Sequence, residues 1–219
     1  MNKNTYLNAM GVDTWLERTV GDESDIIIAP STPSPATSSH SSWTPLEKCI
    51  QACTKCDLHK TRTQTVFGTG NPNADLMFIG EAPGANEDIQ GEPFVGRAGL
   101  LLNEMLASIN LKREDVFIAN ILKCRPPNNR DPKPEETSEC TPYLIQQISH
   151  IQPKIIVALG KIAAQFLIDT KTSLSRLRAQ EHLYENTPLI ATYHPAYLLR
   201  SPLEKLKTWD DLQRIKSYL

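Results

Sequence analysis

The chain has 219 residues, of which 40% are apolar and 22% are charged, and its formal net charge is −2. This composition is typical of a globular protein. A chain without net positive charge needs a local basic face if it binds nucleic acid. No apolar run approaches the roughly 20 residues of a membrane-spanning helix, and the N-terminal residues 1–4 lead into no signal-peptide core. We therefore expect a cytoplasmic protein that does not enter a membrane.

The first 44 residues differ in composition from the rest of the chain. Residues 1–29 form an N-terminal extension, in which Tyr6, Met10 and Leu16 indicate a short amphipathic helix. Residues 30–44 are rich in Ser, Thr and Pro, so they bury too little apolar surface to offset the entropy of ordering, and we predict a flexible linker. The main domain then covers residues 45–219. Two hypotheses stand for the extension: its helix docks a partner protein, or it folds back on the main domain.

Strand and helix patterns alternate along the main domain. Short apolar runs indicate buried strands at residues 76–79, 116–119, 155–159 and 189–192. Helical patterns follow at residues 99–109, 134–148, 161–168 and 203–218. Strands that are separated by helices imply a mostly parallel sheet covered on both faces, so we predict an α/β fold.

Three polar segments, each marked by Gly or Pro, follow predicted strands. They are residues 80–84 (GEAPG), the segment that begins at Asn120, and residues 193–195 (YHP). In open α/β sheets, ligands bind beyond the carboxyl ends of the strands. We therefore expect one active site that is assembled from these three loops.

Four of the five cysteines are candidates for a metal centre. Cys53 and Cys56 form a CxxC pair, and Cys124 and Cys140 flank a proline-stiffened excursion that would return its ends to a common point. Four thiolates bind zinc or an iron–sulfur cluster, and spacing alone does not choose between them. The alternatives are buried cysteines without a ligand, or a redox pair, although no thioredoxin-like strand precedes the CxxC. Cys49 is expected to be a bystander.

Three motifs in this order, together with the cysteines, resemble family 4 uracil-DNA glycosylases. The motifs are residues 80–99 (GEAPG continuing to GEPFVGRAG), residues 120–127 (NILKCRPP) and residues 194–200 (HPAYLLR). The resemblance extends from about residue 46 to the C-terminus. It implies a three-layer α/β/α sandwich with a four-stranded parallel sheet. It also implies a structural [4Fe–4S] cluster beside the DNA-binding groove, held by Cys53, Cys56, Cys124 and Cys140.

The activity that this resemblance implies is base excision repair. The enzyme would flip uracil out of single- or double-stranded DNA and hydrolyse its N-glycosidic bond, leaving an abasic site. Phe94 would stack on the uracil ring. Asn120 would accept a hydrogen bond from uracil N3–H and donate one to O4, and His194 would donate to O2 as negative charge develops there. Ala82 and Gly84 are expected to line the uracil pocket.

The group that activates water is less well defined by the sequence. Ala82 occupies the place at which the best-known uracil glycosylases carry an Asp, which favours a largely dissociative reaction. Glu81 and Glu87 are the nearby candidate catalytic acids. For Glu87, the hypotheses are that it positions water or that it walls the pocket against the methyl group of thymine. Glu81 either takes part in catalysis or hydrogen-bonds its own loop.

The expected DNA contacts lie around the first and third motifs. Arg97 is expected at a helix N-terminus facing phosphate. Leu198 and Arg200, with Leu199 between them, are expected to enter the space left by the flipped base. Further candidates for the groove are Lys123, Arg125 and Arg130. We expect the protein to act as a monomer.

Three other functions are weighed against uracil excision. A glycosylase for mismatched thymine or other deaminated bases is disfavoured by Asn120 and Glu87. A non-catalytic iron–sulfur DNA-binding accessory protein would have no use for a base reader such as Asn120 beside an oxyanion donor such as His194. A zinc-bound structural protein would lack the absorbance at about 400 nm that an iron–sulfur cluster shows.

Overall fold

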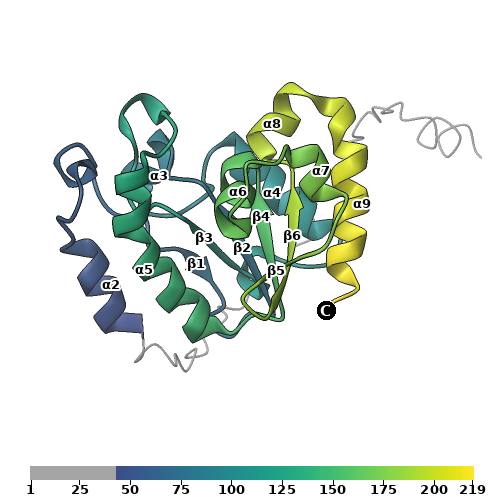
Figure 1. The fold of residues 1–219 in the computed structure, drawn as a ribbon, viewed down its shortest axis with the longest axis horizontal. Helices are drawn as coiled ribbons and strands as arrows, with labels where there is room; N and C mark the ends of the chain where they lie inside the picture. Colours follow the sequence, from purple (N-terminus) through teal and green to yellow (C-terminus); the bar gives the residue numbers. More distant parts are fainter. Residues whose placement is uncertain (1–42) are drawn as a thin grey trace, which may run out of the picture. The chain divides into compact units, whose positions relative to one another are not determined.

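The structure, a computed structural model, describes residues 43–219, so the predicted N-terminal helix lies outside the described residues. A six-stranded sheet in the order β1-β3-β2-β4-β6-β5 forms the centre of this part (Figure 1). Its four central strands are mutually parallel. They are β2 (Leu76–Gly80), β3 (Phe117–Asn120), β4 (Ile155–Leu159) and β6 (Thr187–Thr192).

The predicted α/β fold is confirmed, and the four predicted strands are the four central ones. The predicted strand number is wrong, because the sheet has six strands. The short strands β1 (Thr69–Gly70) and β5 (His182–Tyr184) pair antiparallel to β3 and β6 at the two edges. Neither contains a fully buried residue, so neither has the apolar run by which the central strands were found.

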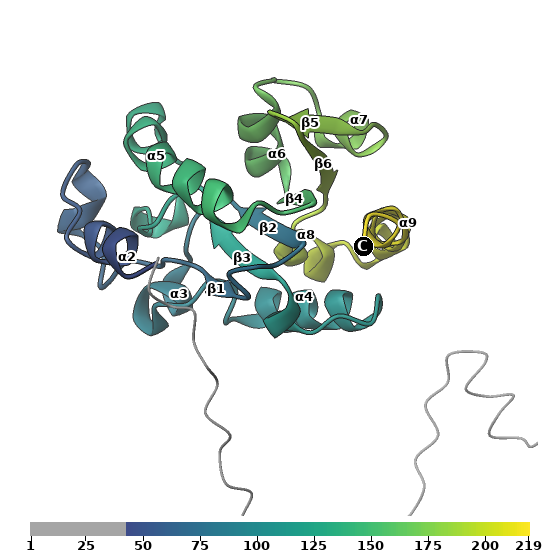
Figure 2. The same cartoon turned by 90° about the horizontal axis from the view of Figure 1, so that it is seen from below.

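The central strands are buried on both faces, and their side chains alternate between two apolar cores. Met77 and Ile79 face one core with residues of four helices, whereas Leu76 and Phe78 face the other core with residues of three helices. Figure 2 shows the two helical layers on either side of the sheet. The first layer consists of α2 (Trp43–Gln51), α5 (Pro134–Ile151), α6 (Lys161–Ile168) and α7 (Leu174–Arg178); the second consists of α4 (Arg97–Ala107), α8 (Pro195–Arg200) and α9 (Lys205–Lys216).

The element boundaries differ from the predicted ones by a few residues. α4 begins two residues before the predicted start at residue 99, α5 extends to Ile151, and α9 begins at Lys205 after a short 3₁₀ turn. Trp43 and Thr44, at the end of the predicted linker, are helical in the structure. The remaining short elements are α3 (Ala85–Gln90) and the 3₁₀ turns Asp57–Lys60, Arg113–Asp115, Pro127–Asn129 and Pro202–Glu204.

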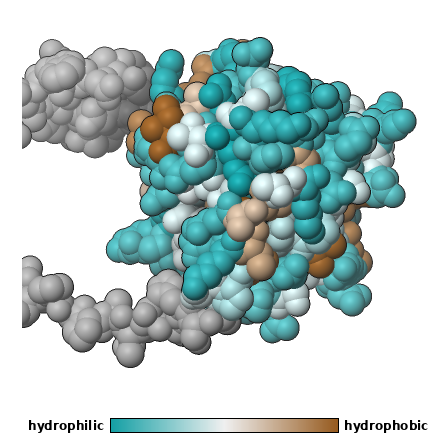
Figure 3. All heavy atoms as spheres, turned by 90° about the vertical axis from the view of Figure 1, so that its left-hand side faces the viewer, coloured by the Kyte–Doolittle hydropathy of each residue, from teal (hydrophilic) through white to brown (hydrophobic). Residues whose placement is uncertain are grey.

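One face of the described domain is mainly polar. Figure 3 shows the face at the left-hand side of Figure 1, where hydrophilic residues dominate and the apolar patches are small and separate. No helix within residues 43–219 is long and apolar enough to cross a membrane.

A buried ion pair joins α9 to the sheet beside the third predicted loop. Arg178 Nε lies 2.7 Å from Asp211 Oδ2, and the same oxygen accepts a hydrogen bond from Thr192 Oγ1 at 2.6 Å. The Arg178 guanidinium also lies over the Tyr193 ring, 4.4 Å from its centroid. Because Tyr193 directly precedes His194, this contact helps to fix the chain at the start of the third motif.

We predict that Asp211→Ala lowers the free energy of unfolding by about 3–5 kcal/mol, because it leaves the Arg178 charge buried without its partner. Equilibrium unfolding in urea measures this loss. The control is Asp210→Ala, which changes an exposed neighbour on the same helix and should cost less than about 0.5 kcal/mol. Equal losses in the two variants would contradict the assignment.

Candidate active site

The three predicted loops meet in one pocket at the carboxyl ends of the parallel strands. Gly80 of β2 pairs with Asn120 of β3, and β4 and β6 continue the parallel sheet on the other side of β2. The pocket has a volume of about 550 Å³. The predicted site residues that line it are Glu81, Ala82, Gly84, Glu87, Phe94, Asn120, His194 and Arg200.

The lack of a side chain at Gly80 allows Phe94 and Asn120 to come together. A Cβ atom at Gly80 would lie 2.4 Å from Asn120 Oδ1 and 2.8 Å from Phe94 Cζ. Both distances are shorter than a van der Waals contact, so any larger residue would push at least one of the two side chains away. The glycine that ends β2 is therefore required by the pocket itself.

Asn120 places a buried acceptor in the pocket. The residue is 2% exposed, and its Oδ1 has no hydrogen-bond partner among the described residues. A buried polar atom without a partner costs about 1–3 kcal/mol, so native proteins rarely contain one without a functional reason. The main-chain oxygen of Asn120, by contrast, accepts a hydrogen bond from Lys123 Nζ at 2.7 Å.

Phe94 lies on a constrained loop between α3 and α4. It is 7% exposed and adopts a φ of 54°, in the left-handed region that a bulky residue rarely occupies. Its ring centroid lies 5.4 Å from that of His194, with the planes tilted by 31°. A Cβ at Gly99 would lie 1.7 Å from Phe94 O, so α4 packs directly against the backbone of this loop.

Glu87 holds the same loop in place. Its Oε1 accepts hydrogen bonds from the main-chain N–H groups of Val95 at 3.0 Å and Gly96 at 3.2 Å. Arg113 also supports the loop by donating to the main-chain oxygen of Pro93. These contacts were not predicted, because nothing in the sequence marks a carboxylate that binds amides eight residues further along the chain. They make Glu87 a structural support for Phe94 in addition to a pocket-lining residue.

His194 is held in one orientation at the start of α8. Its Nδ1 accepts a hydrogen bond from Ala196 N at 3.1 Å and so caps the helix. Burial lowers the pKa of His194 to about 4, the positive charge of Arg200 acts in the same direction, and Glu87 opposes both. The imidazole is therefore neutral near pH 7. Because Nδ1 is the acceptor, the proton of the neutral ring is on Nε2, where it is available to a ligand.

Glu81 is the pocket acid whose pKa is most clearly shifted. It is half-buried, and burial together with the negative charge of Asp131 raises the pKa of its carboxyl to about 7. Asp131 is exposed and lines the same pocket, whereas Asn120 and Phe94 are buried. Glu81 is therefore more exposed than Asn120 and Phe94, and it shares the pocket with a second acid.

Two of the expected DNA contacts need correction. Leu198 is 1% exposed and packs in the apolar core with residues of α4 and α9, so it does not reach the space of a flipped base. Lys123 is also buried, at 1% exposed, and does not line a groove. The six-residue helix α8 is too short for its sequence to reveal which of its apolar residues faces the core.

The other expected DNA contacts are accessible. Arg200 is exposed and lines the pocket, and Arg97 is exposed at the first residue of α4 but lies outside the pocket lining. Arg130 lines the pocket with its guanidinium paired to Glu136. Lys161, an exposed pocket residue that follows Gly160 after the end of β4, was not predicted. Its position just beyond the carboxyl end of a predicted strand was a usable signal, because Glu81 likewise lies just beyond the end of β2.

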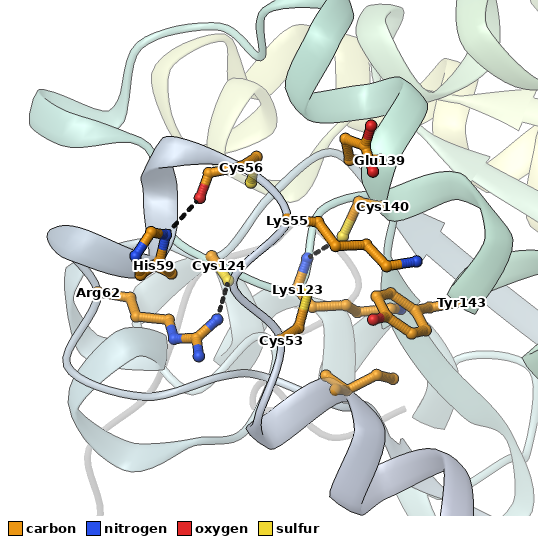
Figure 4. A pocket seen from close by; sticks show the side chains of 11 residues that line it. Cys53, Lys55, Cys56, His59, Arg62, Lys123, Cys124, Glu139, Cys140 and Tyr143 are labelled. Atoms are coloured by element: carbon orange, nitrogen blue, oxygen red, sulfur yellow. Dashed lines mark hydrogen bonds between the residues drawn. The ribbon is translucent and has the colours of Figure 1, made fainter.

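The four candidate metal-binding cysteines line one cavity. Cys53 and Cys56 come from the segment after α2, Cys124 from the segment after β3, and Cys140 from α5 (Figure 4). None of them forms a disulfide. Arg62 Nη1 donates to Cys124 Sγ at 3.1 Å, and the main-chain N–H of Lys123 donates to Cys140 Sγ at 3.2 Å.

The four thiols line one cavity but are not grouped as a preformed metal site. Within residues 43–219, no three His, Cys, Asp or Glu side chains lie so that they could hold a metal ion. Burial raises the pKa of Cys140 to about 11. Thiols in such a place ionise only if a positive group stabilises the thiolates. Cys49 is exposed and does not line the cavity, as predicted for a bystander.

Comparisons with known proteins agree with this geometry. The family model for the uracil DNA glycosylase superfamily matches residues 67–213. The chain is 52% identical to a type-4 uracil-DNA glycosylase of Archaeoglobus fulgidus, over 76% of this chain and 87% of that protein. It is 44% identical to a type-4 uracil-DNA glycosylase of Thermotoga maritima, over 78% of this chain and 91% of that protein. A type-5 uracil-DNA glycosylase of Pyrobaculum aerophilum is 30% identical over 59% of this chain and 64% of its own length.

With its loops, its pocket and its cysteines in this arrangement, the chain belongs to the uracil-DNA glycosylase superfamily, and within it to the type-4 enzymes.

Proposed function

We propose that this chain removes uracil from DNA by hydrolysing the N-glycosidic bond, which leaves an abasic site for base excision repair. One observation carries the assignment of the base: the unpartnered Oδ1 of Asn120, which is buried at the pocket beside Phe94 and Gly80. Membership of the type-4 enzymes supports the reaction.

Recognition of the base follows from the polarity of Asn120. A flipped uracil stacks on Phe94, and its N3–H donates to Asn120 Oδ1, which satisfies the buried acceptor. The carboxamide nitrogen donates to uracil O4. Cytosine has no proton on N3 and a donor amino group at position 4, so both hydrogen bonds would be lost. Each buried unpaired polar group costs about 1–3 kcal/mol, and the pocket therefore discriminates against cytosine.

His194 stabilises the departing base. Cleavage of the glycosidic bond develops negative charge on uracil O2, and the neutral imidazole offers Nε2–H to that oxygen. Because Nδ1 is occupied by Ala196 N, the ring needs no reorientation during the reaction. Preorganised donors of this kind typically contribute about 10²–10³ in rate.

Glu81 acts on the sugar rather than on the base. It lines the pocket together with the exposed Asp131, and we place the deoxyribose of a flipped nucleotide beside its carboxyl. A carboxylate there stabilises the positive charge that develops on the sugar in a dissociative reaction. Ala82 supplies no acid, so Glu81 is the group of the first motif that remains for this role. Glu87 has a different role: its carboxylate accepts hydrogen bonds from the main chain and so holds the loop that carries Phe94.

Lys161 and Arg200 are the cations that we assign to the DNA backbone. Both are exposed and line the pocket, and neither forms an ion pair among the described residues. Arg130 is engaged with Glu136 and Leu198 is buried, so these two residues are not part of the assignment. Phosphates on either side of the flipped nucleotide would contact the free cations, which gives binding that weakens as salt increases.

We assign the cysteine cavity to a [4Fe–4S] cluster held by Cys53, Cys56, Cys124 and Cys140. Such a cluster takes four thiolates, which matches the four ligands that line the cavity. With all its iron atoms ligated by protein, its role is structural: it joins the segment after α2, the segment after β3 and helix α5. A cytoplasmic location, a monomeric state and a protein partner for residues 1–29 remain predictions.

The reaction is tested by incubating the purified chain with labelled oligonucleotides that carry uracil, thymine or cytosine at one position. We expect abasic-site formation at uracil alone, and a decrease in the single-turnover rate of about 10²-fold or more in Asn120→Ala. The control Asn186→Ala changes an exposed residue of the turn before β6 and should react at the wild-type rate. DNA binding without release would favour the accessory-protein alternative, and release of thymine would favour the related glycosylase.

The pKa of Glu81 gives a pH dependence with a defined direction. The pKa is raised to about 7, so the carboxylate that favours reaction prevails at higher pH, and the uracil-release rate should rise as pH increases through about 7. Glu81→Gln should remove this rise, and Asp131→Asn should move it to lower pH by removing a repulsive charge. Single-turnover rates between pH values of about 5 and 9 measure the profile. A profile of unchanged shape in Glu81→Gln would contradict the role.

The cluster assignment is tested by iron content and absorbance. Anaerobically purified protein should contain about four iron atoms per chain and absorb at about 400 nm. Cys140→Ser should lose much of this absorbance, whereas Cys49→Ser, which changes the exposed cysteine outside the cavity, should retain it. Zinc in place of iron would contradict the assignment.

A further inference from the structure

Lys123 is a buried charge that the reaction described above does not use. The residue is 1% exposed, and within residues 43–219 no carboxylate pairs with it. Its Nζ donates instead to two neutral oxygens: the main-chain oxygen of Asn120 at 2.7 Å and Gln147 Oε1 at 2.6 Å. A lysine is almost never fully buried without an acidic partner, because desolvation of the ammonium is costly. The desolvation cost of the Lys123 ammonium therefore indicates that its hydrogen bonds have a functional role.

The contacts of Lys123 run in two directions. Its main-chain N–H donates to Cys140 Sγ, and its main-chain oxygen accepts from Val66 N at 2.8 Å. Its side chain donates to the main-chain oxygen of Asn120, the last residue of β3. Figure 4 shows Lys123 between the cysteines that line the cavity. Lys123 therefore lines the cysteine cavity, and its ammonium donates hydrogen bonds to Asn120 and Gln147.

Gln147 fixes the ammonium from helix α5. The glutamine is fully buried, and its Nε2 donates to Phe67 O at 2.8 Å while its Oε1 accepts from Lys123. Both ends of the amide are thus used, and its orientation is set. Gln147 lines neither the base pocket nor the cysteine cavity. Of its two side-chain hydrogen bonds, the one to Lys123 links Gln147 to Asn120.

We propose that Lys123, held by its hydrogen bond to Gln147, positions Asn120, the residue that recognises the base. Its ammonium holds the main-chain oxygen of Asn120, and this fixes the peptide from which the unpartnered Oδ1 projects toward the base. The inference rests on the proposed function, since it assumes that Asn120 reads uracil. A lysine suits this task because its charge strengthens the hydrogen bond to the carbonyl in a buried setting.

The test compares binding of two uncleaved DNAs that differ only at the flipped position. One oligonucleotide carries 2′-fluoro-2′-deoxyuridine, and the other carries a tetrahydrofuran abasic site. Wild-type protein should bind the fluorouridine DNA more tightly, and the ratio of the two dissociation constants measures base recognition separately from backbone contacts. Absorbance at about 400 nm is recorded for each variant, as a check on the cysteine site.

Lys123→Met should lower the affinity ratio about tenfold, while abasic DNA is bound within about twofold of wild type. The main-chain N–H to Cys140 is kept in this variant. Gln147→Leu should lower the ratio about threefold, because it frees the ammonium but leaves it in place. The controls are Lys171→Met and Gln146→Leu, which change exposed residues of the same types and should keep the wild-type ratio.

An unchanged ratio in Gln147→Leu, or equal losses on both DNAs, would overturn the proposal. If Lys123→Met fails to fold, Gln147→Leu decides alone. If both variants lose the absorbance, Lys123 serves the cysteine site instead, and the proposal is again overturned. Failure of the wild-type protein to release uracil from ordinary uracil DNA is a separate result, which would count against the proposed function.

Discussion

The pairing of Gly80 with Asn120 at the carboxyl ends of two parallel strands is the constraint on which the site depends. The register of β2 and β3 places the first and second motifs side by side. The missing side chain at Gly80 then leaves room for the carboxamide of Asn120 and the ring of Phe94 to approach each other. Without this pairing, the pocket would have no flat surface next to a buried hydrogen-bond acceptor.

The surrounding contacts make this arrangement rigid at a cost in stability. Phe94 is held at a positive φ by the packing of Gly99 and by the carboxylate of Glu87, and the Asn120 acceptor stays unpartnered. Strain and unsatisfied polar groups of this kind cost on the order of 1–3 kcal/mol each and persist where function requires them. A uracil that stacks on Phe94 and donates to Asn120 recovers part of this cost, so binding is selective for the base that has a donor at N3.

The sequence predicted the central sheet well because parallel strands that are buried on both faces appear as continuous apolar runs, as in residues 155–159. The sequence also predicted that the three loops meet in one site, because the carboxyl ends of parallel strands lie at the same edge of a sheet. It could not show that Leu198 faces the core, since a helix of six residues carries too little periodicity. Nor could it show that Lys123 is buried, because its partner Gln147 is distant in sequence and carries no charge.

The most direct measurement of the central claim is the release rate of N3-methyluracil compared with that of uracil from otherwise identical oligonucleotides. The methyl group replaces the N3–H donor and leaves the glycosidic bond in place. If Asn120 Oδ1 reads that proton, methylation should slow the single-turnover rate by about 10²-fold or more, since the acceptor stays unpaired and meets a methyl group. Release of both bases at comparable rates would show that the Asn120 acceptor does not select the base.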